Sequence, residues 1–64
     1  HELLSDRELD VLKLIAGGKT VSEIANDLSL SVNTISTYRA RLLEKMNLKS
    51  NSELTFYAIS NNLI

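Results

Sequence analysis

At 64 residues the chain is long enough for one small domain with a single hydrophobic core, and no apolar run approaches the roughly 20 residues of a membrane-spanning helix. The chain has no cysteine and a single histidine, His1, so it cannot form disulfides and does not favour a structural zinc site. We expect it to bind no metal, no cofactor and no membrane. Seven basic and eight acidic residues give a formal net charge of −1, which on its own weakly disfavours nucleic acid as a partner.

The first predicted helix spans residues 6–16. Ser5 precedes it, and Glu8 three positions later completes a capping-box pattern, in which each side chain accepts a hydrogen bond from the other residue's backbone N–H. The Gly17-Gly18 pair is expected to end the helix, because glycine tolerates the left-handed conformation that a helix terminus favours. Apolar residues at helical spacing predict a buried face of Leu9, Leu12, Ile15 and Ala16, widened by Val11 and Leu14.

Two further helices are predicted over residues 21–28 and 32–46, and only residues 29–31 separate them. The apolar Leu30 in this short turn is expected to fill the corner between the two helices. Helices joined this tightly form a helix-turn-helix, whose second helix can enter the major groove of DNA. The buried residues expected in this pair are Ile24, Ala25, Leu28, Ile35, Leu42 and Met46, with Leu43 partly covered.

The last predicted helix spans about residues 51–61, begins at another capping-box pattern of Ser50 with Glu53, and buries Leu54, Tyr57 and Ala58. No segment has the alternation of a strand. We therefore predict an all-α fold, a four-helix bundle containing a helix-turn-helix, as a single domain over residues 1–64. Since the chain lacks an initial Met and a helix begins almost at once, we expect a domain excised from a longer protein, and His1 is compatible with a tag or cloning remnant.

One face of the predicted helix over residues 32–46 has the character needed to recognise DNA bases. With its apolar residues turned inward, the opposite stripe is small or polar, apart from Glu44 near the far end. Small side chains allow close approach to the groove, and amide or hydroxyl groups can pair with base edges. The residues predicted to contact bases are Asn33, Ser36, Thr37 and Ala40.

Basic residues concentrate on and just after the same helix. Residues 33–64 hold four basic and two acidic residues, whereas residues 1–32 hold three basic and six acidic ones. The Tyr38 ring can fill a corner between helices while its hydroxyl donates to a phosphate, and Thr34 lies in a first turn whose N–H groups suit an anion. The residues predicted to contact phosphates are Thr34, Tyr38, Arg39, Arg41, Lys45 and Lys49.

A second stripe on the last helix lies away from its buried face and consists of Thr55, Ile59, Asn62 and Leu63. An exposed isoleucine with a polar rim suits a small twofold contact between two copies, and we expect a homodimer on DNA. From the residues alone, an isolated apolar side chain on an ordinary surface is an equally good interpretation.

The chain resembles the LuxR-type helix-turn-helix found at the end of NarL/FixJ response regulators. The resemblance covers nearly the whole length, and the run from Thr34 to Arg39 is most similar to BvgA/EvgA-like regulators. The matching residues are Leu4-Ser5-Asp6-Arg7-Glu8, Val11-Leu12, Ala16, Gly18, Glu23-Ile24-Ala25, Leu28, Leu30-Ser31, Thr34-Ile35, Lys45-Met46 and Leu48.

The resemblance implies a tetrahelical DNA-binding domain of a cytoplasmic bacterial transcription regulator in a two-component system. It also implies a preceding receiver domain, pairing of two copies through the last helix, and a contact with RNA polymerase. By position, Ser36, Thr37 and Ala40 match base-facing sites of the family, whereas Thr34, Tyr38, Arg41, Lys45 and Lys49 match or neighbour backbone-contacting ones. This chain differs from many members of the family at three positions. Those members have Lys where this chain has Ser36, His where it has Tyr38, and Arg where it has Asn51.

Two interpretations of function remain open from the sequence. The first is sequence-specific binding of double-stranded DNA by a transcription regulator. The second is a helix-turn-helix that binds another protein through its polar face and does not bind DNA, which the net charge of −1 slightly favours. An enzyme is not expected, because the sequence contains no His–carboxylate pair, no cysteine and no glycine-rich phosphate loop.

Overall fold

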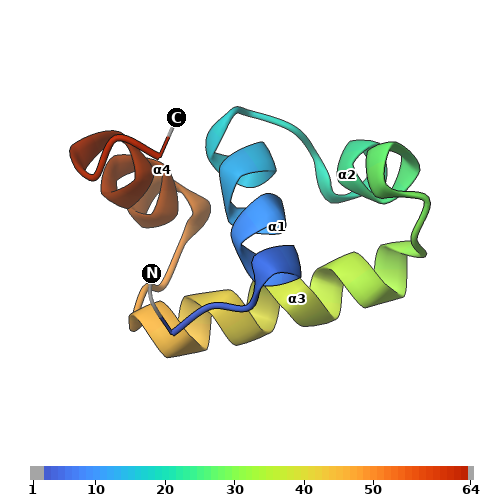
Figure 1. Cartoon of the computed structure of the whole chain (residues 1–64), viewed down its shortest axis with the longest axis horizontal. Helices are drawn as coiled ribbons and strands as arrows, with labels where there is room; N and C mark the ends of the chain where they lie inside the picture. The colour runs from blue at the N-terminus through green and yellow to red at the C-terminus, as the bar shows by residue number, and fades with distance from the viewer. Residues whose placement is uncertain (1–2, 64) are drawn as a thin grey trace.

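The fold is known from a computed structural model, which describes residues 3–63 and contains only α-helices as regular structure in that range (Figure 1). The helices are α1 (Asp6–Ala16), α2 (Val21–Leu28), α3 (Val32–Met46) and α4 (Asn51–Ser60). The first three have the predicted bounds, and α4 ends one residue before the expected Asn61. The predicted all-α fold is confirmed. His1, which we considered as a tag remnant, lies outside the described residues.

Side chains cap the beginning of every helix, as the sequence predicts. At α1 the Ser5 Oγ accepts from Glu8 N at 3.2 Å, and a Glu8 carboxylate oxygen accepts from Ser5 N at 2.9 Å. Thr20 and Glu23 make the same reciprocal pair at α2, with the same two distances. These bonds satisfy N–H groups that have no partner within the helix, so they fix where each helix starts.

The capping box predicted for α4 is only half formed. Ser50 Oγ accepts from Glu53 N at 3.2 Å, as in the other two boxes. The Glu53 carboxylate, however, accepts from the backbone N–H of Lys49 and not from that of Ser50. The acidic side chain therefore stabilises the α3–α4 connection, one residue before the expected cap.

Three turns depend on backbone conformations with positive φ. Gly18 after α1 has a φ of 97°, and Ser29 and Asn47, which follow α2 and α3, both have a φ of 57°. At the α2–α3 turn, Leu30 N donates to Ala25 O at 2.9 Å, which satisfies a carbonyl at the end of α2. The turn thus reaches the left-handed conformation without the glycine that usually supplies it.

The buried core is built around α1, which packs against α2, α3 and α4. Figure 1 shows α1 between α2 and α4, with α3 crossing beneath all three. The buried apolar residues are Val11, Leu12, Ile15, Ala16, Ile24, Ala25, Ile35, Leu42, Leu43, Leu54 and Ala58.

The buried face of α1 is rotated from the predicted one. Val11 is fully buried, whereas Leu9 is only half-buried. Glu8 also lies on the buried face and is 4% exposed, and Leu9 lies at the edge of that face. A charged residue that the sequence analysis treated only as a cap is therefore part of the buried face of α1.

Four other predictions of burial differ in degree. Met46, the last residue of α3, and Leu28, the last of α2, are half-buried, because a side chain at a helix end is covered on one side only. Tyr57 is half-buried on the flank of α4, and Leu43 is buried although only partial cover was expected. The last buried residue of α3 is therefore Leu43, about one turn before the helix ends.

Candidate nucleic-acid interface

The face of α3 that points away from the other helices carries the predicted base-contacting stripe. Figure 1 shows α3 along one side of the molecule with α1, α2 and α4 on the other side. All four stripe residues are exposed, and they are Asn33, Ser36, Thr37 and Ala40. No bulky side chain is among them, so the backbone of α3 can approach a flat or concave partner closely. Glu44, also exposed, continues the stripe toward the end of α3.

The hydroxyl of Thr37 is already used once within the helix. Its Oγ1 donates to the backbone carbonyl of Asn33 at 3.0 Å. This bond fixes the side-chain rotamer, and it leaves the oxygen lone pairs and the methyl group facing outward. Thr37 is therefore arranged to accept a hydrogen bond or to touch an apolar group such as a thymine methyl.

The beginning of α3 is held by two hydroxyl groups. Ser31 Oγ accepts from Thr34 N at 3.1 Å and lies 2.8 Å from the hydroxyl oxygen of Thr34. Thr34 is half-buried and Val32, beside it, is 47% exposed. The predicted phosphate-contacting residue Thr34 thus lies next to the N-terminal N–H groups of α3, which favour an anion.

The structure divides the predicted phosphate-contacting cations into two kinds. Arg41 and Lys49 are exposed, and their charged groups have no partner within residues 3–63. Arg39 is half-buried and donates from Nε to the Oδ1 of Asn51 at 2.8 Å. Lys45 pairs with Glu8. Only Arg41 and Lys49 therefore have charged groups without an internal contact, and Arg39 keeps only the guanidinium nitrogens that do not bind Asn51.

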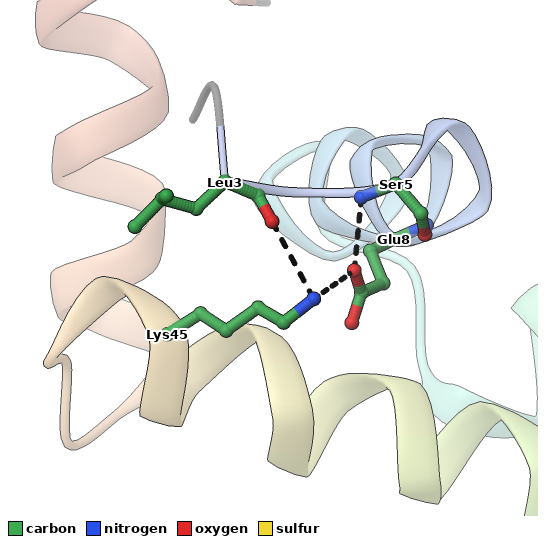
Figure 2. Close-up of polar contacts among 4 residues, drawn as sticks. All are labelled: Leu3, Ser5, Glu8 and Lys45. Carbon is green, nitrogen blue, oxygen red and sulfur yellow. Dashed lines mark hydrogen bonds and ion pairs between the residues drawn. The ribbon is translucent and has the colours of Figure 1, made fainter.

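Lys45 of α3 reaches the buried carboxylate of α1. Its Nζ lies 2.7 Å from Glu8 Oε1 and 3.4 Å from the Leu3 carbonyl oxygen, as Figure 2 shows. The Lys45 ammonium and the Ser5 N–H hold the pKa of the Glu8 carboxyl at about 2, below its ordinary 4.5, although burial opposes that shift. Glu8 is therefore ionised at neutral pH inside the domain.

Sequence reasoning treated Glu8 only as a capping residue and missed this ion pair. A signal was present, because Glu8 lies four and seven positions before Leu12 and Ile15, on the same helical face. An acid within an apolar stripe needs a partner when it is buried. The sequence did not indicate which cation would supply it, since Lys45 lies 37 positions away.

Tyr38 is half-buried and packs against the hydrophobic core. The structure thus supports the first of its two predicted roles, in which the ring fills space between helices. Its hydroxyl as a phosphate donor stays a prediction.

The stripe predicted for a twofold contact is only partly exposed. Ile59 is 59% exposed and Asn62 is exposed, whereas Thr55 and Leu63 are half-buried. The adjacent Phe56, which the sequence analysis did not single out, is 73% exposed. Phe56 and Ile59 lie three positions apart, so the apolar surface of α4 is larger than predicted.

Within residues 3–63 no helix has the length and apolar character to cross a membrane. In the same range no three His, Cys, Asp or Glu side chains come together as metal ligands would.

A short helix held by a tight turn against a longer one, whose outer face is small, polar and flanked by cations, defines a helix-turn-helix domain of the DNA-binding class. A comparison with known protein families identifies the family of this domain. The family described as bacterial regulatory proteins, luxR family, matches residues 2–58, and the chain belongs to that family. The predicted family is thereby confirmed.

Several curated proteins are similar to the chain. It is 44% identical over 62 residues to the oxygen regulatory protein NreC of Staphylococcus carnosus. It is 49% identical over 61 residues to the virulence transcription regulator BvgA of Bordetella pertussis. It is 42% identical over 60 residues to the response regulator UvrY of Escherichia coli. These matches cover 97%, 95% and 94% of this chain but only 29%, 29% and 28% of the relatives, so the chain spans less than a third of their length.

Proposed function

We propose that this domain binds double-stranded DNA with sequence preference by placing α3 in the major groove. The observation that carries the proposal is the outer face of α3, where the exposed stripe contains no bulky side chain and lies beside the uncommitted cation Arg41. A helix needs this combination to approach base edges closely while its flanks contact the two phosphate backbones. Membership of the luxR family supports the same function.

Within this proposal the stripe on α3 contacts the bases. Asn33 can form paired hydrogen bonds with adenine, and Ser36 can donate to or accept from several bases. Thr37 presents its methyl group and lone pairs, because its hydroxyl hydrogen is bound to the Asn33 carbonyl. Ala40 contacts a thymine methyl or simply permits close approach.

Phosphate contacts come first from the exposed cations Arg41 and Lys49. Thr34 and the hydroxyl of Tyr38 add neutral contacts near the beginning and middle of α3. Arg39 can contribute through the guanidinium nitrogens that do not bind Asn51. Lys45 is constrained by its pairing with Glu8.

We also propose that the domain is the output unit of a longer response regulator, cytoplasmic in a bacterium, that pairs on DNA and contacts RNA polymerase. UvrY is named a response regulator and BvgA a transcription regulator, and both are more than three times as long as the matched region. The twofold contact is assigned to Thr55, Ile59, Asn62 and Leu63 of α4, to which the exposed Phe56 is now added. One helix pair is small, so the free chain is expected to be monomeric and to pair when DNA brings copies together.

A titration of the 64-residue chain with duplexes enriched from a random pool tests DNA binding directly. The logarithm of the association constant is expected to fall steeply and linearly with the logarithm of salt concentration. Arg41→Ala and Lys49→Ala are each expected to reduce that slope by about one. Lys13→Ala, which removes an exposed cation from α1, is the matched control and is expected to leave the slope unchanged. Binding that is absent, or indifferent to salt, would favour the protein-interaction alternative.

A further inference from the structure

Glu8 is the one charged residue buried in the core of the described range, and it makes two contacts through a single oxygen. Its Oε1 accepts from Ser5 N at 2.9 Å and from Lys45 Nζ at 2.7 Å. The capping box requires only the first contact, and a neutral glutamine would serve it as well. The contact with Lys45 therefore depends on the negative charge of Glu8, whereas the cap would survive its loss.

The Lys45 side chain leaves α3 in the direction of the N-terminal end of α1. Figure 2 shows its ammonium between the Glu8 carboxylate and the Leu3 carbonyl, so two of its three N–H groups have acceptors there. The side chain of Lys45 is 42% exposed, whereas that of Glu8 is 5% exposed. Drawing Lys45 away to a phosphate would leave a buried carboxylate without a cation, which is strongly unfavourable.

The Glu8–Lys45 contact lies at the last turn of α3, where few apolar side chains are buried. Leu42 and Leu43 are buried, but Met46, in the last turn of the helix, is only half-buried. The chain then passes through the left-handed Asn47 to Lys49. The orientation of this last turn relative to α1 therefore contributes to where Lys49 lies against a DNA backbone, together with the packing of Leu48 on the core and the bond from Lys49 N to Glu53.

We propose that Glu8 and Lys45 form a positioning pair for DNA binding, in which Lys45 fixes the last turn of α3 to α1 and does not serve as a phosphate ligand. The inference rests on the proposed function of α3. It revises the part that the sequence predicted for Lys45, because the cation acts through Glu8 and not on DNA. Glu8 becomes a residue of the DNA-binding apparatus although it is buried away from the interface.

The sign of the effect of Glu8→Gln separates the two roles. If Glu8 merely masked a phosphate ligand, its neutralisation would free Lys45, remove a negative charge and tighten DNA binding. If the pair positions α3, the same substitution loosens the last turn, and affinity is expected to fall about fivefold despite the more positive net charge. Glutamine keeps an oxygen for the Ser5 N–H, so the cap of α1 survives.

The salt dependence of binding supplies a second, independent measurement. Lys45→Met is expected to lower affinity at every salt concentration with an unchanged slope, whereas the control Lys49→Ala lowers the slope by about one. The double variant Glu8→Gln/Lys45→Met is expected to lose no more affinity than Lys45→Met alone, because both substitutions break one contact. All titrations are made at a temperature at which circular dichroism shows each variant fully helical, so unfolding does not contribute.

The outcomes distinguish this inference from the proposed function. A parent chain without salt-dependent DNA binding would overturn both. A parent that binds, with Glu8→Gln binding more tightly or Lys45→Met lowering the slope by about one, would overturn the positioning pair and leave DNA binding by α3 intact.

Discussion

The guanidinium of Arg39 on α3 is joined to α4 through Asn51, whose Oδ1 accepts from Arg39 Nε at 2.8 Å. Asn51 is the first residue of α4, so the bond links the proposed base-contacting helix to the helix proposed for pairing. The family resemblance implies arginine at the position of Asn51 in many members, and a second cation beside Arg39 would repel it. Asn51 lacks the positive charge of an arginine, and its side chain instead joins α3 to α4 through Arg39.

Asn51→Ala is expected to lower the free energy of unfolding by about 0.5–1.5 kcal/mol, the ordinary net contribution of one hydrogen bond. Urea denaturation followed by circular dichroism measures this change. Ser52→Ala, at the neighbouring exposed position of α4, is the matched control and is expected to have a smaller effect. Equal stability of parent and Asn51→Ala would mean that solvent replaces the Arg39 contact without cost.

Thr20→Ala removes the cap of α2 and is expected to lower the free energy of unfolding by about 1 kcal/mol. The N–H of Glu23 loses its acceptor, and the bond from the N–H of residue 20 to the Glu23 carboxylate loses the reciprocal contact that supports it. Thermal unfolding is a suitable measurement, since a change of this size shifts the melting temperature of a small domain by roughly 4–8 °C. Ser22→Ala, two residues into α2 and exposed, serves as the control. The cap would be shown to be dispensable if both variants melted together.

The stability of the domain is expected to fall on acidification, in part through Glu8. Its pKa is about 2 in the folded state against an ordinary 4.5, so the unfolded chain binds more protons between these values. The contribution of Glu8 is fully present above about pH 4.5 and is lost as the pH falls toward 2. Glu23, with a pKa lowered by its bonds to Thr20, adds to the same trend.

Denaturation midpoints measured from pH 7 to pH 2.5 isolate this contribution when parent and Glu8→Gln are compared. The parent is expected to lose stability more steeply than Glu8→Gln, and the two curves should converge at the acidic end. Parallel curves would show that the carboxylate of Glu8 is no better stabilised in the folded state than in the unfolded chain.

Base preference is expected to change when Ser36 and Thr37 are replaced together by alanine. Each good side-chain pair with a base contributes about 1–3 kcal/mol of discrimination, and both positions lie in the middle of the exposed stripe. Selection from randomised duplexes compares the preferred motif of the double variant with that of the parent. Ser22→Ala, on the outer side of α2, is the control, and an identical motif for all three proteins would place base recognition elsewhere.

Pairing on DNA is expected to depend on the apolar surface of α4. Ile59→Asp puts a charge where two helices would meet, so cooperative binding to a duplex with two half-sites should be lost while binding to one half-site persists. The exposed Ser60 provides a matched control as Ser60→Asp. Cooperativity that survives in Ile59→Asp but not in Phe56→Asp would shift the contact around the helix toward Phe56.

The helices of this domain could be predicted closely because their boundaries are encoded locally. Ser5, Thr20 and Ser31 each cap the helix that follows them, and the short interval from Ser29 to Ser31 leaves room only for a tight turn. Such signals involve residues three or four positions apart, and the backbone responds to them directly. The helix-turn-helix followed from the same local information.

The side-chain partners that decide the site could not be predicted in the same way. Which face of α1 is buried depends on the three helices packed around it, and this is why Val11, expected at the edge of the buried face, is fully buried whereas Leu9 is only half-buried. The cations of α3 looked equivalent in sequence, yet Lys45 is paired across 37 positions and Arg39 across 12. Contacts between residues far apart in the chain produce no periodic pattern in the sequence. Only the folded structure therefore shows which cations are free to contact DNA and which are bound to other residues of the domain.

The central place of α1 has a consequence for how the domain opens. α2 and α4 flank α1 and α3 crosses it, so α4 has α1 as its main neighbour, whereas α2 packs mainly against α3 (Figure 1). A fluctuation that withdraws α1 exposes the inner face of α4, whereas α2 and α3 keep their contacts with each other. Amide protons in the middle of α4 should therefore exchange with solvent whenever α1 is withdrawn, whereas those in the middle of α2 stay protected until the α2–α3 pair also separates.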